Sequence, residues 1–410
     1  MVEKHSDVER EQKQREGARA QRERESAQRE GESAQREGES AQQGTARARA
    51  AVPVIDLGPL SGCGLAPQQA HASVERRLAR QLVEALSTVG FAALSNHGIS
   101  GASLSALQES AQRFFSLPSS EKAQISMAHR GRAWRGYFSE GAELTSGLAD
   151  QKEGIYFGVD HAPAHPSVLK GFPMHGENLW PAQSSTLRPL VEEHMRAAQA
   201  LGEQLLGLIG LGLGLGRGYF AGRFQGAEPT CLFRIFNYPA HPEERARESE
   251  RWGVGPHTDM GLLTLLFQDA SGGLELQRRD GSWVEAPAQP ERCLINIGDM
   301  LERWTWGRLR ATLHRVKSPE SAPRLSFPFF YDPPWEATLE PIDEARFLPR
   351  GGDPSLPASS PEAGSWGSAG AAERWDGLPL HELEDTITYG DFVWEKIRTV
   401  FPSLAGENSS

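Results

Sequence analysis

Seven short apolar runs between residues 230 and 331 constrain the fold of this chain more than any other feature of its sequence. Each run is separated from the next by a turn that contains Gly, Pro, Asp or Ser. Seven short strands within about 100 residues predict an antiparallel sandwich or jelly roll. The runs are Leu232–Tyr238, Leu262–Phe267, Gly273–Gln277, Trp283–Glu285, Cys293–Ile297, Thr312–Lys317 and Arg324–Tyr331.

The residues before and after this region predict helices and a few further strands. Residues 52–57 predict a short buried strand, residues 73–87 keep their apolar side chains on one helical face, and residues 90–95 predict a returning strand. A second amphipathic helix is predicted over Leu187–Leu208, stopped by the glycines that follow it. A closing helix is predicted over Tyr389–Phe401, where a proline ends it.

Two segments have compositions that do not support a packed core. Residues 1–50 contain no Leu, Ile, Phe, Tyr or Trp, and residues 25–44 repeat the heptad ESAQREG. A coiled coil needs two apolar seam positions per heptad and this repeat offers only Ala and Gly, so we predict a disordered tail, with a solvated helix or a partner-binding arm as alternatives. Residues 349–373 are rich in Gly, Pro, Ser and Ala and predict a flexible surface insertion.

These patterns divide the chain into five parts. They are a disordered tail (1–50), an N-terminal region of helices and strands (51–225), the β core (226–348), a flexible insertion (349–375) and a C-terminal segment that completes the domain (376–410).

Charge and cysteine content exclude several classes of protein. The net charge is −11, and residues 1–50 contribute none of it because they hold 11 basic and 11 acidic residues. An acidic body argues against a nucleic-acid partner. The longest lipid-like run, Leu205–Gly216, has 12 residues, short of the roughly 18 that span a bilayer, so no membrane association is expected. The 3 cysteines form no CxxC pair, and we expect a cytoplasmic monomer.

A histidine next but one to a carboxylate is the first metal signal in the sequence. The pairs are His5/Asp7, His175/Glu177, His241/Glu243 and His257/Asp259. Context favours the last pair, because it alone opens a strongly apolar strand, at residues 261–267, and alternate residues of a strand share a face. His314 offers a third ligand from another strand. Two imidazoles and one carboxylate leave positions open for O2 and substrate on Fe(II), and tetrahedral zinc is the main alternative.

An Arg-x-Ser motif, Arg324-Leu-Ser326, follows His314 by ten residues. The intervening turn predicts a hairpin that displaces Arg324 from His314 by roughly 10 Å along the strands. That offset suits a short diacid held between the metal and the guanidinium, because an Arg fork beside a hydroxyl binds carboxylates well. A surface Arg paired with Glu320 or Asp332 is the alternative.

Several segments together resemble the iron(II)- and 2-oxoglutarate-dependent oxygenases of the isopenicillin N synthase-like family. In the β region these are GPHTDMGLLTLLFQD, GGLELQRRDGSWVEA, LINIGDMLERWT, LHRV and RLSFPFFYDP. Earlier segments resemble the N-terminal region of the same family, namely VPVIDL, VGFAALSNHGI, FFSLPSSEK, RGYF and EGIYFG. The resemblance covers residues 52–402 and implies a mainly β fold with flanking helices around a double-stranded β-helix (jelly-roll) core.

The resemblance also implies a set of site residues and a reaction. The iron ligands would be His257, Asp259 and His314, and the residues that bind 2-oxoglutarate would be Arg324, Ser326 and Tyr238. The implied enzyme is a non-haem iron dioxygenase that uses O2 and 2-oxoglutarate to oxidise a C–H bond of a small organic molecule, by hydroxylation or desaturation, and releases succinate and CO2.

Three alternatives remain open from the sequence. They are a 2-oxoglutarate-independent oxidase of the same family, a non-catalytic binding or oxygen-sensing module for which the tail is the partner arm, and a zinc-bound jelly-roll hydrolase or lyase. Aromatic residues near the site are predicted to belong to the core or to wall off water: Trp304, Phe327, Phe329 and Phe330. Family placement suggests four substrate-side candidates, Tyr137, Phe138, Tyr156 and Phe157.

Overall fold

The computed structural model of the chain describes residues 52–61, 68–145, 147–240, 252–347 and 383–400. Several predictions lie outside these residues, namely those for the tail (1–50), the insertion (349–375) and the pairs His5/Asp7 and His241/Glu243.

The larger of two facing sheets has eight strands in the order β1-β2-β12-β9-β14-β7-β6-β3. Neighbours run antiparallel except β1 and β2, which are parallel. The strands are β1 (Val54–Asp56), β2 (Phe91–Ser95), β3 (Gly136–Phe138), β6 (Glu153–Gly158), β7 (Thr230–Tyr238), β9 (Leu263–Gln268), β12 (Cys293–Ile297) and β14 (Arg324–Asp332). Strands from both sides of the predicted boundary at residue 226 therefore share one sheet.

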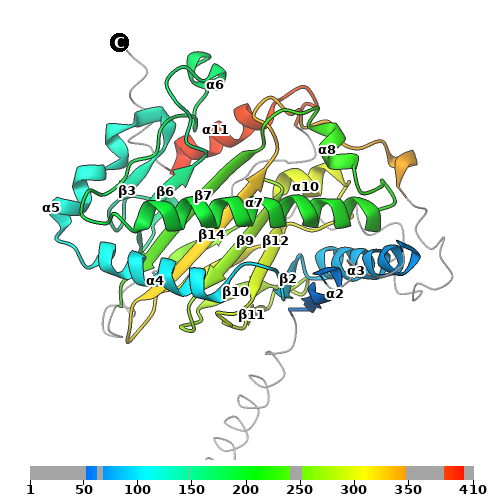
Figure 1. Ribbon diagram of the computed structural model, residues 1–410, viewed down its shortest axis with the longest axis horizontal. Helices are drawn as coiled ribbons and strands as arrows, with labels where there is room; N and C mark the ends of the chain where they lie inside the picture. Colours follow the sequence, from blue (N-terminus) through cyan, green and yellow to red (C-terminus); the bar gives the residue numbers. More distant parts are fainter. Residues whose placement is uncertain (1–51, 62–67, 146, 241–251, 348–382, 401–410) are drawn as a thin grey trace, which may run out of the picture. The chain divides into compact units, whose positions relative to one another are not determined.

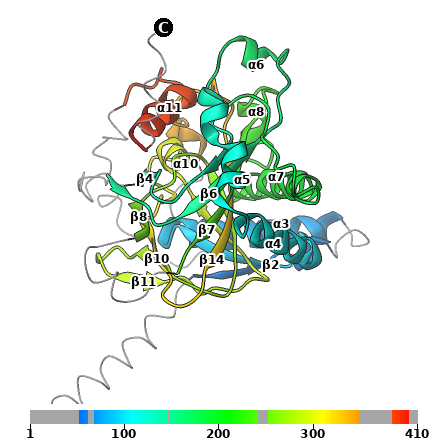
Figure 2. The same ribbon diagram turned by 90° about the vertical axis from the view of Figure 1, so that its left-hand side faces the viewer.

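The smaller sheet has four antiparallel strands in the order β11-β10-β13-β8. They are β8 (Trp252–His257), β10 (Leu274–Gln277), β11 (Trp283–Glu285) and β13 (His314–Lys317), and a separate hairpin pairs β4 (Leu144–Thr145) with β5 (Leu148–Ala149). Figure 2 shows the small sheet on the opposite side of the large sheet from the long helices. The two facing sheets confirm the predicted jelly-roll core.

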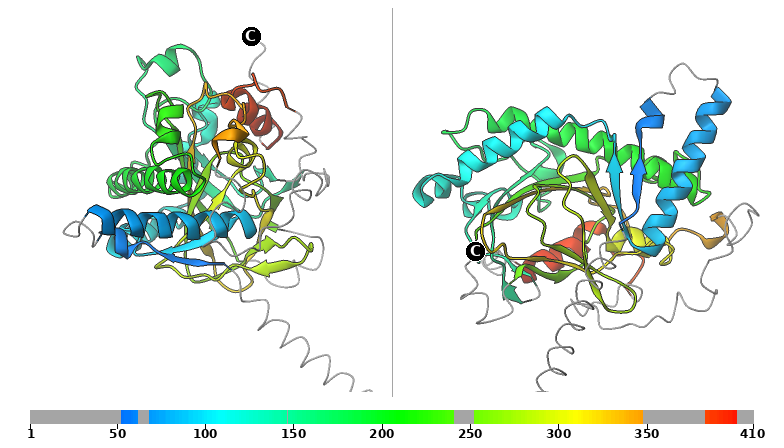
Figure 3. Two further views of the ribbon diagram at one scale, coloured as in Figure 1. Left: turned by 90° about the vertical axis from the view of Figure 1, so that its right-hand side faces the viewer. Right: turned by 90° about the horizontal axis from the view of Figure 1, so that it is seen from below.

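Helices cover the outer face of the large sheet (Figures 1 and 3). The longest, α7, packs on β7, β9 and β14, and α3 and α4 both lie along one side of it. The helices are α2 (Gly58–Ser61), α3 (Gln68–Thr88), α4 (Gly101–Phe115), α5 (Ser119–Lys122), α6 (Pro166–Leu169), α7 (Leu187–Gly212), α8 (Tyr219–Arg223), α10 (Asp299–Trp304) and α11 (Tyr389–Val400). Short 3-10 turns occupy Ala123–Ile125, Met127–His129, Gly131–Ala133 and Glu344–Arg346. With its apolar face against the sheet, α7 leaves the inner face of the jelly roll free for a site.

The predicted end of the α7 helix is wrong, because the helix continues through the glycines to Gly212. A Cβ atom on Gly212 would lie 2.5 Å from the carbonyl oxygen of Ala79 in α3, and one on Gly202 would lie 2.9 Å from the Tyr331 ring on β14. Glycine is therefore used inside this helix for close packing against its neighbours, and the energy of that packing outweighs the low helix propensity of glycine.

Strand pairing corrects two further predictions. His257 does not open the apolar strand that follows it but ends β8, whose sequence WGVGPH contains the turn-forming residues that hid the strand from a pattern search. The hairpin predicted between the strands of His314 and Arg324 does not form, because β13 pairs with β8 and β10 whereas β14 pairs with β7 and β9. The turn between them crosses from one sheet to the other.

None of the helices among the described residues is long and apolar enough to cross a membrane. Cys231 and Cys293 are both buried and carry free thiols.

Candidate active site

The two sheets enclose a cavity of about 110 Å³. Its walls come from β7 and β14 of the large sheet, from β8 and β13 of the small sheet and from the turn after β8. All six residues predicted for the site line it: Tyr238, His257, Asp259, His314, Arg324 and Ser326. The fold thus brings together side chains that are spread over about 90 residues of sequence.

The two histidines are cross-strand neighbours at the ends of β8 and β13, where His257 lies opposite His314. The Nδ1 atom of His257 lies 2.8 Å from the carbonyl oxygen of Gly255, and that of His314 lies 3.0 Å from the carbonyl oxygen of Thr312. A carbonyl oxygen only accepts, so each Nδ1 must carry the proton. Both Nε2 atoms therefore present a lone pair to the cavity, which is the state a metal ligand requires.

Asp259 completes the cluster from the turn that follows β8. Its Oδ1 atom lies 3.9 Å from the Nε2 atoms of both His257 and His314, too far for a hydrogen bond. Its Oδ2 atom accepts from Thr264, at 2.5 Å, and from Asn296, at 2.6 Å, which are paired neighbours on β9 and β12. One oxygen is thus fixed by the protein while the other faces the two imidazoles.

Electrostatics favours the protonation states that bind metal. Burial, helped by the neighbouring His314, lowers the pKa of His257 to about 3, so its imidazole is neutral at pH 7. Burial alone would raise the pKa of Asp259, but attraction to the two histidines in their protonated form and the hydrogen bonds from Thr264 and Asn296 outweigh it, so the pKa is lowered. A neutral imidazole and an ionised carboxylate are the forms that coordinate a divalent cation.

The donor set fits a metal ion. The ligand atoms of His257, Asp259 and His314 lie within 4.8 Å of one another, so one cation between them would reach all three. Two imidazoles and one carboxylate that face an open cavity match the arrangement of iron oxygenases that leave coordination positions free.

A second cluster meets the same distance criterion but differs in chemistry. It contains His161, His165 and Glu228, again within 4.8 Å. The Nδ1 atom of His165 accepts from the Ser167 N–H at 3.3 Å, so in the neutral ring the proton sits on Nε2. His161 Nε2 donates to the Glu228 carboxylate at 2.8 Å. In these tautomers both Nε2 atoms carry protons where a metal would need lone pairs.

The remaining histidine–carboxylate pair within the described residues, His175/Glu177, does not converge on one point. His175 Nδ1 donates to the carbonyl oxygen of Pro173 at 2.8 Å, whereas Glu177 pairs with Arg130 at 3.3 Å. The two side chains have separate partners, so the pair forms no metal site.

Arg324 lies at the start of β14 with its side chain 1% exposed, which rules out the surface ion pair with Glu320 or Asp332. Its Nη2 donates to Gln268 Oε1 at 2.7 Å, and its guanidinium lies 4.7 Å from the Tyr238 ring. The Nε and Nη1 atoms have no hydrogen-bond partner among the described residues. A buried cation with two unsatisfied donors implies that an anion belongs beside it.

Alternation along β14 decides which neighbours share the cavity with Arg324. Ser326, Pro328 and Phe330 line it, whereas Phe327 and Phe329 on the other face belong to the core. Trp304 also belongs to the core. Three of the four aromatic residues, Trp304, Phe327 and Phe329, therefore belong to the core, and Phe330 lines the cavity.

Sequence reasoning missed a group of charged, polar and aromatic residues in the cavity wall. Its members are Trp134, Glu143, Thr145, Lys152 and Arg234. Lys152 is 2% exposed and pairs with Asp150 at 2.6 Å and with Glu143 at 2.9 Å. For Arg234 a signal existed, because it alternates along β7 with Phe236 and Tyr238 and so shares their inward face.

The four aromatic residues that the family resemblance suggested as substrate contacts do not line the cavity. Phe138 and Tyr156 form the layer behind it, where the Tyr156 ring lies 5.9 Å from Phe236 and 4.9 Å from Trp134. Tyr137 donates to Glu153 at 2.6 Å, and Phe157 stacks on Trp180. These residues support the cavity wall rather than form it.

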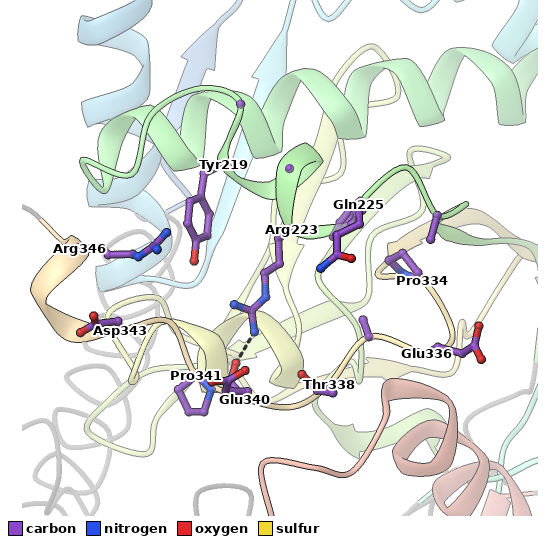
Figure 4. Close-up of a pocket in the computed structure, with 15 residues that line it drawn as sticks. Tyr219, Arg223, Gln225, Pro334, Glu336, Thr338, Glu340, Pro341, Asp343 and Arg346 are labelled. Atoms are coloured by element: carbon purple, nitrogen blue, oxygen red, sulfur yellow. Dashed lines mark hydrogen bonds between the residues drawn. The ribbon is translucent and has the colours of Figure 1, made fainter.

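A larger groove of about 850 Å³ lies between α8 and residues 334–346 (Figure 4). Arg223 reaches across it to the backbone carbonyl of Glu340, while Tyr219 and Arg346 lie at one end. None of the six predicted site residues lines this groove. Its size alone does not make it the active site, because it lacks the converging ligand set.

Comparison with known proteins agrees with the geometry. Residues 52–183 match the family described as the N-terminal region of non-haem dioxygenases in morphine synthesis, and residues 229–333 match the 2OG-Fe(II) oxygenase superfamily. A Dictyostelium discoideum protein described as a probable iron/ascorbate oxidoreductase is 34% identical over 80% of this chain and 90% of its own length. A homoarginine-6-hydroxylase of Oryza sativa subsp. japonica is 33% identical over 86% of this chain and 98% of its own.

A solved structure extends the likeness to three dimensions. A 2OG-Fe(II) oxygenase family protein from Caulobacter crescentus superposes with a TM-score of 0.63 at 27% identity, covering 85% of this chain and 99% of its own. Fold and site together define a non-haem iron enzyme. The chain belongs to the 2OG-Fe(II) oxygenase superfamily, and its metal and cosubstrate are Fe(II) and 2-oxoglutarate. It is a non-haem iron dioxygenase.

Proposed function

We propose that this enzyme hydroxylates an unactivated C–H bond of a small organic molecule and releases succinate and CO2. The observation that carries the proposal is a single cavity that holds both a preorganised His–Asp–His cluster and a buried Arg324 with unsatisfied donors. The first feature suits a ferrous ion and the second suits the carboxylate of a keto acid.

Three residues are proposed as iron ligands: His257, Asp259 and His314. Iron(II) and 2-oxoglutarate, when bound, activate O2 and couple the oxidative decarboxylation of the keto acid to oxidation of the substrate. The protein holds the ligands ready, because the carbonyl oxygens of Gly255 and Thr312 fix both imidazole rings with Nε2 facing inward.

Three further residues are proposed to position 2-oxoglutarate. Arg324 would bind its distal carboxylate through the two free donors, with the Ser326 hydroxyl beside it on the same face of β14. The Tyr238 ring packs 4.7 Å from the guanidinium, which restricts its orientation. A fixed guanidinium determines where the keto acid lies and so where its chelating end points.

Hydroxylation is favoured over desaturation or ring closure by the likeness to a homoarginine-6-hydroxylase, which covers 98% of that relative. A 2-oxoglutarate-independent oxidase would use Arg324 to hold the carboxylate of its own substrate, so the release of succinate separates it from the proposed dioxygenase. A zinc hydrolase would not need Arg324 at all, and a non-catalytic module would show no turnover.

The test is a coupled assay under defined iron. Purified protein is supplied with Fe(II), ascorbate, 2-oxoglutarate and O2, with and without a panel of small organic acids that includes homoarginine, and succinate, O2 uptake and hydroxylated product are measured. The proposal expects succinate in stoichiometric balance with hydroxylated product. Asp259→Ala is expected to remove turnover, while Asp280→Ala, an exposed acid in the β10–β11 turn, retains it.

Each alternative has its own signature in this assay. O2 uptake and substrate oxidation without succinate would replace the proposal with the 2-oxoglutarate-independent oxidase. Activity that is lost on chelation and restored by zinc but not by Fe(II) would replace it with a hydrolase or lyase. O2 uptake no greater than that of Asp259→Ala for every substrate would favour a non-catalytic module.

A further inference from the structure

A second guanidinium faces the cavity from the middle of a neighbouring strand of the large sheet. Arg234 lies on β7 and shares its inward face with Phe236 and Tyr238. Tyr238 is the cross-strand partner of Arg324. Arg234 comes four residues earlier on the strand, so the two arginines are separated by about 13 Å along the sheet. The described part of the cavity lining therefore holds three cationic side chains: Arg324 is assigned to the cosubstrate, Lys152 is paired with Asp150 and Glu143, and Arg234 remains.

Arg234 is held by aromatic rings rather than by hydrogen bonds. Its guanidinium lies 4.4 Å from the Tyr156 ring, 4.6 Å from the Phe330 ring and 4.8 Å from the Trp134 ring. Its Nε atom is buried without a hydrogen-bond partner among the described residues. Rings that cover the flat faces of a guanidinium leave its edge, where all the N–H donors lie, as the part available to a ligand.

The nearby acids already have other contact partners. Glu143 accepts from the Tyr156 hydroxyl at 2.8 Å and pairs with Lys152 at 2.9 Å. Asp150 pairs with Lys152 at 2.6 Å and accepts from Thr145 at 2.7 Å. Neither acid forms an ion pair with Arg234 within contact distance, although Glu143 is near enough to feel its charge. Within the described part of the chain, the half-buried guanidinium of Arg234 is therefore left as the free cationic donor group in this part of the cavity.

We propose that Arg234 binds the carboxylate of the primary substrate and thereby restricts the enzyme to small organic acids. The inference rests on the proposed function, because it assumes that Arg324 takes the cosubstrate. A carboxylate would satisfy the fork of Arg234 with parallel N–H···O bonds in a partly desolvated site, where such pairs are strong. The aromatic rings keep the fork oriented before the substrate arrives, which lowers the entropic cost of binding.

The experiment measures binding to the loaded protein without turnover. Wild-type protein with Fe(II) and 2-oxoglutarate under anaerobic conditions is screened by thermal shift against aliphatic, aromatic and amino carboxylic acids, each beside its own carboxamide. The dissociation constant of the best acid is then measured by calorimetry for wild type, Arg234→Gln, Arg234→Lys and the control Arg346→Gln. Arg346 lies in the separate groove of Figure 4, so its replacement removes the same charge away from the cavity.

The proposal expects at least one acid to bind at least about tenfold more tightly than its carboxamide and to lose about 30-fold or more of its affinity in Arg234→Gln. Arg234→Lys should fall between the two, because it keeps the charge and loses the fork. The dissociation constant of 2-oxoglutarate should stay within about twofold in all four proteins. This last measurement separates the two proposals, since failure of wild type to bind 2-oxoglutarate would count against the proposed function instead.

Three results would overturn the assignment. They are equal binding of acids and their amides, unchanged acid affinity in Arg234→Gln, and a screen in which only neutral or cationic compounds or no compounds at all stabilise the loaded protein. If Arg234→Gln were unstable, Arg234→Lys would decide the matter, because a purely structural arginine predicts lower stability without any change in the preference for acid over amide.

Discussion

Replacement of Arg324 by Met tests whether this arginine binds a ligand or supports the fold. A ligand-binding arginine predicts that stability stays equal or rises while the affinity for 2-oxoglutarate falls. In the protein without 2-oxoglutarate, Arg324 is a buried cation whose Nε and Nη1 donors lack partners among the described residues. Each such donor costs about 1–3 kcal/mol. Among the described residues, replacement removes one hydrogen bond, to Gln268, and the contact of the guanidinium with the Tyr238 ring. The free energy of unfolding of Arg324→Met should therefore be unchanged or higher by up to about 3 kcal/mol.

Binding of 2-oxoglutarate should change in the opposite direction. Removal of one partner of a buried, hydrogen-bonded charge pair costs about 2–5 kcal/mol, which is roughly 30- to 5,000-fold in the dissociation constant. The two measurements are urea unfolding of the cosubstrate-free proteins and anaerobic calorimetric titration of 2-oxoglutarate into the Fe(II)-loaded proteins.

Arg135 provides a matched control, because it is equally buried but its donors reach the carbonyl oxygens of Met174, at 2.7 Å, and Ala133, at 3.0 Å. Arg135→Met should lose stability by about 1–3 kcal/mol or more. The reasoning is refuted if Arg324→Met is destabilised as much as Arg135→Met, or if it binds 2-oxoglutarate within threefold of wild type.

Two further predictions concern the residues that hold the turn carrying Asp259. Gly261→Ala should lower the free energy of unfolding by about 1–3 kcal/mol or more and reduce the iron content, because the added Cβ would lie 1.4 Å from Asp332 Oδ1. The control in urea unfolding is Gly101→Ala, whose added Cβ meets no atom within 4 Å. Equal losses of stability in the two variants would contradict the packing argument. Burial raises the pKa of Asp332 to about 7 in the folded protein, above its value of about 4 in the unfolded chain. Between these two pH values the folded protein binds a proton that the unfolded chain has released, so the free energy of unfolding falls as the pH rises from about 4 to 7. Asp332→Asn should remove up to about 1.4 kcal/mol per pH unit from this fall in the free energy of unfolding, as measured by urea unfolding at several pH values. If the free energy of unfolding varied with pH in the same way in both proteins, the assignment of the pH dependence to Asp332 would be wrong.

The local part of the site could be predicted from sequence. His257 and Asp259 lie next but one to each other ahead of an apolar run, and strand boundaries around His314 and Arg324 follow from short-range composition. These features depend on nearby residues, which is why the strands of the core were predicted with small errors at their ends.

Strand pairing could not be predicted in the same way. β13 and β14 are joined by a short turn that favours a hairpin, yet each finds its partners in a different sheet. The choice depends on which apolar faces must be buried together across the whole domain, and no local pattern contains that information. β8 was missed for a related reason, since Gly253 faces the Tyr238 ring and glycine is needed there for close approach.

The charged wall of the cavity was missed because buried charge is rare. Lys152, Glu143 and Arg234 carry side chains that composition assigns to the surface. Their convergence arises from three strands or turns that meet only in the folded sheet, and their burial is tolerated because Lys152 has two acidic partners and Arg234 has three aromatic ones.

The central claim is that His257, Asp259 and His314 hold one ferrous ion on which 2-oxoglutarate chelates. The most direct test is the visible charge-transfer absorption that develops when 2-oxoglutarate is added anaerobically to Fe(II)-loaded protein. The account predicts this absorption at one equivalent of iron per chain in wild type, none in Asp259→Ala, and its appearance in Arg324→Met only at much higher 2-oxoglutarate. An Asp259→Ala protein that binds iron and develops the same absorption as wild type would contradict it.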